Sequence, residues 1–233
     1  MEHSKKLIAL HDNARAQYSR IQDAVRDERK QALEDRRFCT IPGAQWEGDL
    51  SQQYENRPKF EVNKVHLSVI RIINEYRNNR VSVDFMPRKD GDDDLADLCD
   101  SMYRADEQDS DAVEAYDNAF EEAVMGGIGA FRLRADYEDE YDEENEYQRI
   151  KIEPIYDADI SVFFDLDAKR QDKSDAKYCF VVTSMTPEDY EDKYDDDPQT
   201  WPQEITEGQN DWSTQDVVYV AEHYIVEEKS ETR

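Results

Sequence analysis

Hydrophobic residues near the start of the chain recur with the period of an α-helix. Residues 4–37 contain no glycine or proline, and their apolar side chains form a narrow stripe, which predicts one long amphipathic helix. Such a stripe must pack either on the helix's own domain or on a neighbouring subunit. It consists of two adjacent rows, Leu7, Ala14 and Ile21 on one and Tyr18, Val25 and Ala32 on the other.

Helical spacing continues after a break in the pattern. Residues 38–49 contain one proline and two glycines, which indicates a connector. Three more helices are predicted from the recurrence of apolar residues. They span residues 60–79, 92–107 and 111–125.

Strand patterns occupy one segment between helices and most of the chain after residue 128. Val81, Val83 and Phe85 alternate with polar residues and predict a strand that Pro87 ends. Thr186 and Pro187 have the residue types of an N-cap and first position of a short helix. The later predicted strands are 128–137, 148–155, 159–165, 178–185 and 216–228.

Strands this close in sequence favour an antiparallel meander with helices on one side. We therefore predict an α+β fold in which a long N-terminal helix and a helical segment pack with an antiparallel sheet. The predicted organisation is an N-terminal helical segment and connector at 1–58, followed by an α+β domain at 59–233.

Charge restricts the possible functions. The chain of 233 residues has 29 basic and 57 acidic residues, a net charge of −28. Residues 1–37 hold nine basic and seven acidic residues, so the acidic excess lies in the remainder. An acidic surface repels phosphates, which disfavours a nucleic-acid-binding module. Three widely spaced cysteines favour a reducing compartment, and no stretch is apolar and long enough for a membrane span.

The sequence does not match the known motifs for catalysis, cofactor binding or metal binding that were compared with it. Phosphate loops run from strand to glycine loop to helix, whereas here a predicted helix precedes the glycines, so Gly126 or Gly127 is expected to close it. The acidic segment 137–147 lacks the glycine of an EF-hand at its sixth place and is interpreted as a hydrated hairpin tip. Histidines and cysteines lack zinc-ligand spacing. We predict no enzyme activity, no cofactor and no metal site.

Candidate functional residues are limited to possible interfaces. Tyr18, Ile21 and Val25 of the first helix are candidates for subunit contact, with packing inside the molecule as the alternative. Trp201 and Trp212 lie in a segment with proline and asparagine, where an aromatic side chain either anchors a neighbour or folds inward.

Four stretches together resemble the portal proteins of short-tailed phages of the Salmonella podovirus type. The strings GGIGAFRLRADYED (126–139) and DLDAKRQDKSDAKYC (165–179) are the most specific parts. The matching stretches keep the family's order and cover more than half of the chain. They span residues 54–91, 102–139, 150–185 and 211–232.

The resemblance implies a subunit of a dodecameric ring at a capsid vertex. Such a ring is a channel for DNA packaging and ejection, without sequence-specific binding of the double-stranded DNA. Coat and scaffolding proteins, terminase, and tail or head-completion proteins are the implied partners. The expected location is the virion, and the host cytoplasm during assembly. Family members are longer, so we expect a fragment, the wing, without stem, clip and crown or barrel.

Two other functions stay open at this point. An acidic adaptor for a basic partner would also explain the charge, and an enzyme that uses a divalent metal would explain the acidic clusters. The resemblance favours the portal subunit over both. An acidic body also suits a conduit that DNA slides past, since few phosphate contacts mean little affinity from released counterions.

Overall fold

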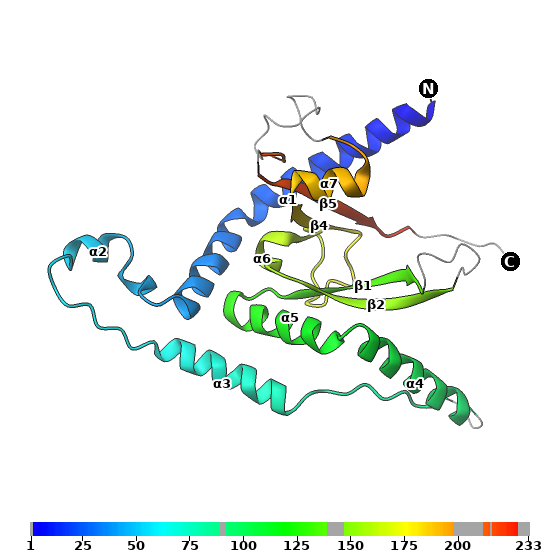
Figure 1. Cartoon of the computed structure of the whole chain (residues 1–233), viewed down its shortest axis with the longest axis horizontal. Coiled ribbons are helices and arrows are strands. Elements are labelled where there is room, and N and C mark those ends of the chain that lie inside the picture. Colours follow the sequence, from blue (N-terminus) through cyan, green and yellow to red (C-terminus); the bar gives the residue numbers. More distant parts are fainter. Residues whose placement is uncertain (1, 89–91, 139–146, 198–211, 215, 228–233) are drawn as a thin grey trace. The chain divides into compact units, whose positions relative to one another are not determined.

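A computed structural model describes residues 2–88, 92–138, 147–197, 212–214 and 216–227 (Figure 1). The chain combines a long N-terminal helix and several further helices with small antiparallel sheets, which confirms the α+β prediction. The helices are α1 (Glu2–Thr40), η1 (Ala44–Trp46), α2 (Asp49–Gln53), α3 (Lys64–Asn78), α4 (Asp93–Asp109), α5 (Ala112–Gly126), α6 (Ala158–Ser161) and α7 (Pro187–Tyr194). The strands are β1 (Ala130–Tyr137), β2 (Gln148–Ile155), β3 (Val162–Phe164), β4 (Tyr178–Met185) and β5 (Val218–Ile225).

The chain forms two compact units. Unit 1 comprises residues 1–27 and 160–233, and unit 2 comprises residues 28–159. Helix α1 contributes its first part to unit 1 and its last part to unit 2, so these packing units differ from the segments separated at residue 58. The predicted boundary at residue 58 stays a prediction.

Unit 2 is built on the β1–β2 hairpin. The strands pair antiparallel from Ala130 opposite Ile155 to Tyr137 opposite Gln148. Helix α5 packs on both strands and α4 packs on β2, and Figure 1 shows the two helices on the same side of the hairpin. The alternating burial of β1 follows from this one-sided cover. Ala112, Ala115 and Ile152 form the buried centre of this layer.

Helix α3 is joined to the end of α1 through one asparagine. Asn63 caps α3, since its side-chain oxygen accepts a hydrogen bond from the amide of His66 at 2.8 Å. Its Nδ2 donates to the carbonyl oxygens of Phe38 and Cys39 at 3.1 and 3.2 Å. Behind the cap, Cys39 packs with Val69 and Ile73 of α3 in a buried cluster.

Two arginines of α1 hold the turn between β2 and α6. Arg29 donates to the carbonyl oxygens of Ala158 and Asp159 at 2.9 and 2.8 Å. Arg36 forms ion pairs with Asp157 and with Asp159, the latter at 3.1 Å. Asp159 is only 2% exposed. Burial by itself lowers the pKa of Arg36, but the hydrogen bond to Asp157 and the two aspartate charges outweigh it and raise the pKa.

The strand predicted at Val81–Phe85 is wrong. Residues 80–87 belong to no helix or strand of the described chain. The backbone N–H of Phe85 instead donates to Oδ1 of Asp100 on α4 at 2.9 Å, and the Phe85 ring lies edge-on to Tyr103 at 6.0 Å. Alternation records which side chains point the same way, but it does not supply a partner strand.

Gly127 and Gly129 have different structural roles. Gly127 ends α5 with a φ of 83°, which confirms that a glycine of this cluster closes the helix. Position 129 requires glycine because the backbone there lies very close to α5. A Cβ at this position would lie 1.7 Å from the carbonyl oxygen of Ala119. The backbone immediately before β1 can therefore approach α5 this closely only at a residue without a side chain.

Gly129→Ala is expected to lower the unfolding free energy of unit 2 by about 1–3 kcal/mol, because helix and strand must separate. Gly126→Ala is the control, since its Cβ would meet Ala32 at an ordinary 3.5 Å. Urea denaturation followed by circular dichroism measures both variants. Equal effects of the two substitutions would contradict the close approach.

Unit 1 packs the first part of α1 with the three-stranded sheet β3-β4-β5 and α7. The strands are antiparallel neighbours in chain order, with Phe163 opposite Phe180 and Phe180 opposite His223. The predicted cap of α7 is confirmed, since Thr186 accepts a hydrogen bond from the amide of Asp189.

The predicted single meander is wrong in one respect, because the strands form two sheets. The turn after β2 contains Asp157 with a φ of 54°. Oε1 and Oε2 of Glu122 accept hydrogen bonds from the amides of Asp157 and Ala158 at 2.8 and 2.9 Å. After this turn and α6 the chain enters unit 1, where β3 pairs with β4.

Candidate interface surfaces

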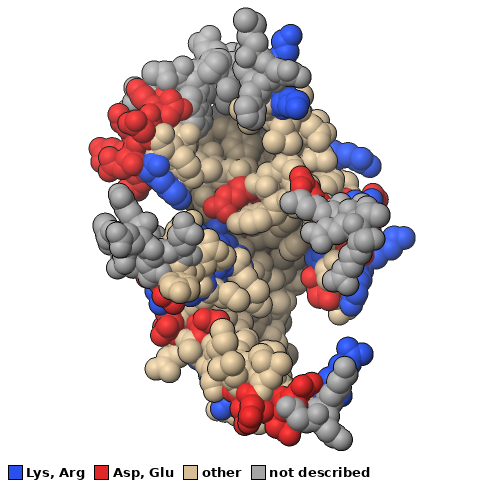
Figure 2. Space-filling model, turned by 90° about the vertical axis from the view of Figure 1, so that its right-hand side faces the viewer, with Lys and Arg blue, Asp and Glu red and all other residues tan. Residues whose placement is uncertain are grey.

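The described surface carries many charges but no grouped metal ligands. Figure 2 shows, on one face, acidic side chains gathered in several places among basic and uncharged ones. Among the residues that the structure describes, no three His, Cys, Asp or Glu side chains are placed to hold a metal ion. The predicted hairpin tip lies almost entirely at 139–146, outside the described residues. No helix in the described ranges has the length and apolar character to cross a bilayer.

Three of the sequence-predicted interface residues meet inside unit 1. Tyr18 and Ile21 of α1 are 8% and 1% exposed, and they form one cluster with Phe163 and Phe180 of the sheet, against which Val25 packs. Intramolecular packing, one of the two alternatives, is therefore what the structure shows for these side chains. A subunit contact through Tyr18, Ile21 and Val25 stays a prediction.

Of the two predicted tryptophans, Trp212 is described and Trp201 lies outside the described residues. The Trp212 ring lies 5.3 Å from the Tyr18 ring. The Trp212 carbonyl oxygen accepts a hydrogen bond from the amide of Tyr219 at 2.8 Å. Trp212 thus folds inward on α1 and β5, while its contact with a neighbour stays a prediction.

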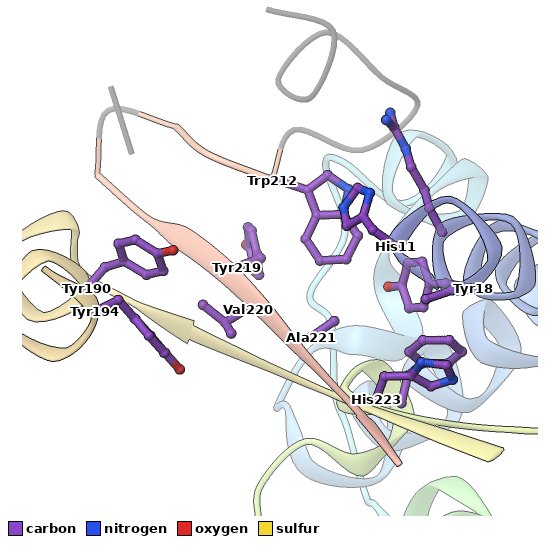
Figure 3. Close-up of a pocket in the computed structure, with 12 residues that line it drawn as sticks. His11, Tyr18, Tyr190, Tyr194, Trp212, Tyr219, Val220, Ala221 and His223 are labelled. Carbon is purple, nitrogen blue, oxygen red and sulfur yellow. The ribbon is translucent and has the colours of Figure 1, made fainter. Parts of the chain in front are cut away.

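A pocket of about 410 Å³ opens beside this cluster (Figure 3). Helix α1 contributes His11 and Tyr18, and β5 contributes Tyr219 and His223 to its lining. Tyr190 and Tyr194 of α7 line it too, although sequence reasoning missed them. Their i, i+4 spacing places both on one face of the short helix. The mostly aromatic and apolar lining can receive an apolar or aromatic group.

His223 is held in this lining by stacking. Its ring lies 4.3 Å from that of Phe180 at an interplanar angle of 7°. Its Nε2 is buried and has no hydrogen-bond partner among the described residues. Burial disfavours the charged imidazole and lowers its pKa below the ordinary 6.5.

The lowered pKa predicts a loss of stability in acid. Unfolded chains bind a proton at His223 below about pH 6.5 while the folded chain still resists it, so the stability of unit 1 falls as pH drops through that range. Lowering the pH from about 7.5 to about 5.5 is expected to reduce the unfolding free energy of unit 1 less in His223→Phe than in the unaltered chain. Urea denaturation at both pH values measures the two losses. His11→Gln, at an exposed position, is the control. Identical losses for all three proteins would contradict the prediction.

Several apolar residues outside the buried clusters of the two units are exposed in the described chain. The apolar stripe of α1 is buried at Ile21 but exposed near the start of the helix. There, Leu7 and Leu10 are 61% and 49% exposed. Segment 80–87 exposes Val81 at 86%. Helix α4 exposes a row of its own, Leu95, Leu98 and Met102. Contiguous exposed apolar surface is typical of sites that bind another protein.

The comparisons with known proteins agree on one family. The sequence matches the family described as phage P22-like portal protein over residues 15–233. A curated relative, the portal protein of Acyrthosiphon pisum secondary endosymbiont phage 1, is 40% identical over 235 aligned residues. The alignment covers 97% of this chain and 33% of the relative, so the chain spans about a third of that protein's length. By the extent of both matches, the chain belongs to the P22-like portal protein family.

Proposed function

We propose that this chain is part of a phage portal subunit, a structural and non-catalytic protein that forms a ring at one capsid vertex. The observation that carries this proposal is the family match over residues 15–233. The relative with 97% coverage of this chain is itself a portal protein. The uncovered apolar residues of α1, α4 and segment 80–87 support assembly, because a ring gives each subunit neighbours that bury such surface.

The proposed role is to form part of the ring around the channel through which the genome passes. Double-stranded DNA enters during packaging and leaves during ejection, and a net charge of −28 keeps it from adhering to the body of the protein. We place the ring in the virion at the capsid vertex, after assembly in the host cytoplasm. The proposed ring size is twelve subunits.

The proposed partners follow from that position. We assign the α+β region matched here to the wing, which faces coat protein, scaffolding protein and packaged DNA. Contacts with terminase and with tail or head-completion proteins are assigned to those parts of a portal protein that this chain does not match. The coverage of 33% of the relative is the reason for this assignment.

Electron microscopy and light scattering of protein expressed from the complete gene test the proposal. Closed rings with a central channel are the expected result. A strict monomer across protein and salt concentrations would overturn it, and salt-sensitive capture of a basic partner by that monomer would favour an acidic adaptor. Tight stoichiometric binding of calcium, magnesium or manganese in calorimetry would instead favour a metal-dependent activity.

A further inference from the structure

Two apolar rows, one on α1 and one on α4, are uncovered among the described residues. The α1 row contains Leu7 and Leu10, and the α4 row contains Leu95, Leu98 and Met102, each of the three more than half exposed. The spacing i, i+3, i+7 puts the α4 residues on one face of the helix. We propose that the start of α1 in one copy packs on this α4 face of a second copy. This inference rests on the proposed function, because it names a contact within the ring.

Opposite charge accompanies the two rows. Residues 5–20 contain four basic residues and one acidic residue, whereas α4 contains seven acidic residues and one basic residue. Lys5 and Lys6 border the row on α1, and exposed Asp94 and Asp97 border the row on α4. An apolar centre with complementary charge at its rim is the usual composition of a specific interface.

Charge also distinguishes this pairing from the alternatives. Contact between two copies of α1 would place Lys5 and Lys6 against like charges. Helix α3 exposes Leu67 at 67%, but it contains three basic residues and one acidic residue, so it repels the start of α1. The pairing of α1 with α4 joins two different surfaces of the same protein. Such a heterologous contact can close into a ring.

Cysteine cross-linking between two differently labelled copies tests the contact. Protein from the complete gene, with Cys39 and Cys179 replaced by alanine and Cys99 by serine, carries either Leu7→Cys or Leu98→Cys. The two variants are assembled as a mixture and oxidised. Both positions are exposed, so folding is expected to be retained, and circular dichroism checks this.

A heterodimer that forms only in the mixture is the expected product. Leu67→Cys mixed with Leu7→Cys is the matched control, and its yield is expected to be lower by at least about tenfold, since like charge keeps α3 and α1 apart. If rings form but the cross-link yield does not exceed that of this control, the α1–α4 contact is wrong and the proposed function still stands. Absence of rings in the protein with its native cysteines, seen by microscopy, overturns the proposed function and this contact together.

Charge reversal gives a second, independent measurement. Lys5→Glu with Lys6→Glu is expected to reduce the cross-link yield by about tenfold, because the rims then repel. Adding Asp94→Lys and Asp97→Lys to the same protein restores opposite charges and is expected to restore the yield. An unchanged yield in the first protein, or no recovery in the second, counts against the α1–α4 contact.

Discussion

Arg36→Met is expected to lower the unfolding free energy of unit 2 by about 3 kcal/mol, because it leaves a buried carboxylate without its cation. The side chain of Asp159 is 3% exposed, and Arg36 Nη1 lies 3.1 Å from its Oδ1. Oδ2 of Asp159 has no hydrogen-bond partner among the described residues. Arg36 is therefore the compensating charge that the structure shows for this group. Urea denaturation with hydrogen exchange of the amides around Asp159 measures the effect.

A neighbouring arginine provides the matched control for that experiment. Arg37 pairs with Glu47 at 3.0 Å, but both side chains are more than half exposed, so Arg37→Met is expected to cost less than about 1 kcal/mol. Asp159→Asn in the Arg36→Met background removes the uncompensated charge and should recover part of the loss. Equal effects at Arg36 and Arg37 would show that burial of Asp159 does not govern the stability of this turn.

Ile21→Ala is expected to lower the unfolding free energy of unit 1 by about 2–5 kcal/mol, through lost apolar burial and the cavity left behind. Ile21 is 1% exposed and belongs to the cluster with Tyr18, Phe163 and Phe180. Trp212 packs on the same cluster, so tryptophan fluorescence during urea unfolding, in a protein with Trp46 and Trp201 replaced by phenylalanine, follows this unit.

Leu7→Ala on the same helical row is the control for Ile21. Its side chain is 61% exposed, so the 233-residue chain should keep its stability within about 0.5 kcal/mol. In the ring, the same substitution is expected to weaken assembly, because Leu7 then loses its proposed cover. A large loss of chain stability from Leu7→Ala would mean that the start of α1 is already buried in the single subunit.

Local patterns in the sequence predicted most of the elements. The helices α1, α3, α4 and α5 follow from apolar residues at helical spacing, and β1, β2, β4 and β5 follow from alternation, because both periods arise within a few residues of backbone geometry. The cap of α7 at Thr186 is equally local. The prediction failed at residues 80–87, where the same alternation had no partner strand and the amide of Phe85 bonded to Asp100 instead.

The candidate interface could be predicted only in part. The sequence identified the α1 stripe, but its burial at Ile21 and exposure at Leu7 depend on how far the sheet of unit 1 extends along the helix. The lining residues Tyr190 and His223 come from separate elements, so no motif links them. The sequence predicted the helix α4, but it did not predict that the apolar row of α4 is exposed. Periodicity does not say which face of a helix another element covers.

By itself the sequence determined the α+β class, most of the longer helices and strands, the acidic charge and the membership in a portal family, since each depends on residue types and near neighbours along the chain. Only the tertiary structure decided that the strands form two sheets, that Gly129 lies against the Ala119 carbonyl, and that Arg36 compensates Asp159. These contacts join residues far apart in sequence. Their energies depend on distance and burial in the folded chain, which local periodicity does not contain.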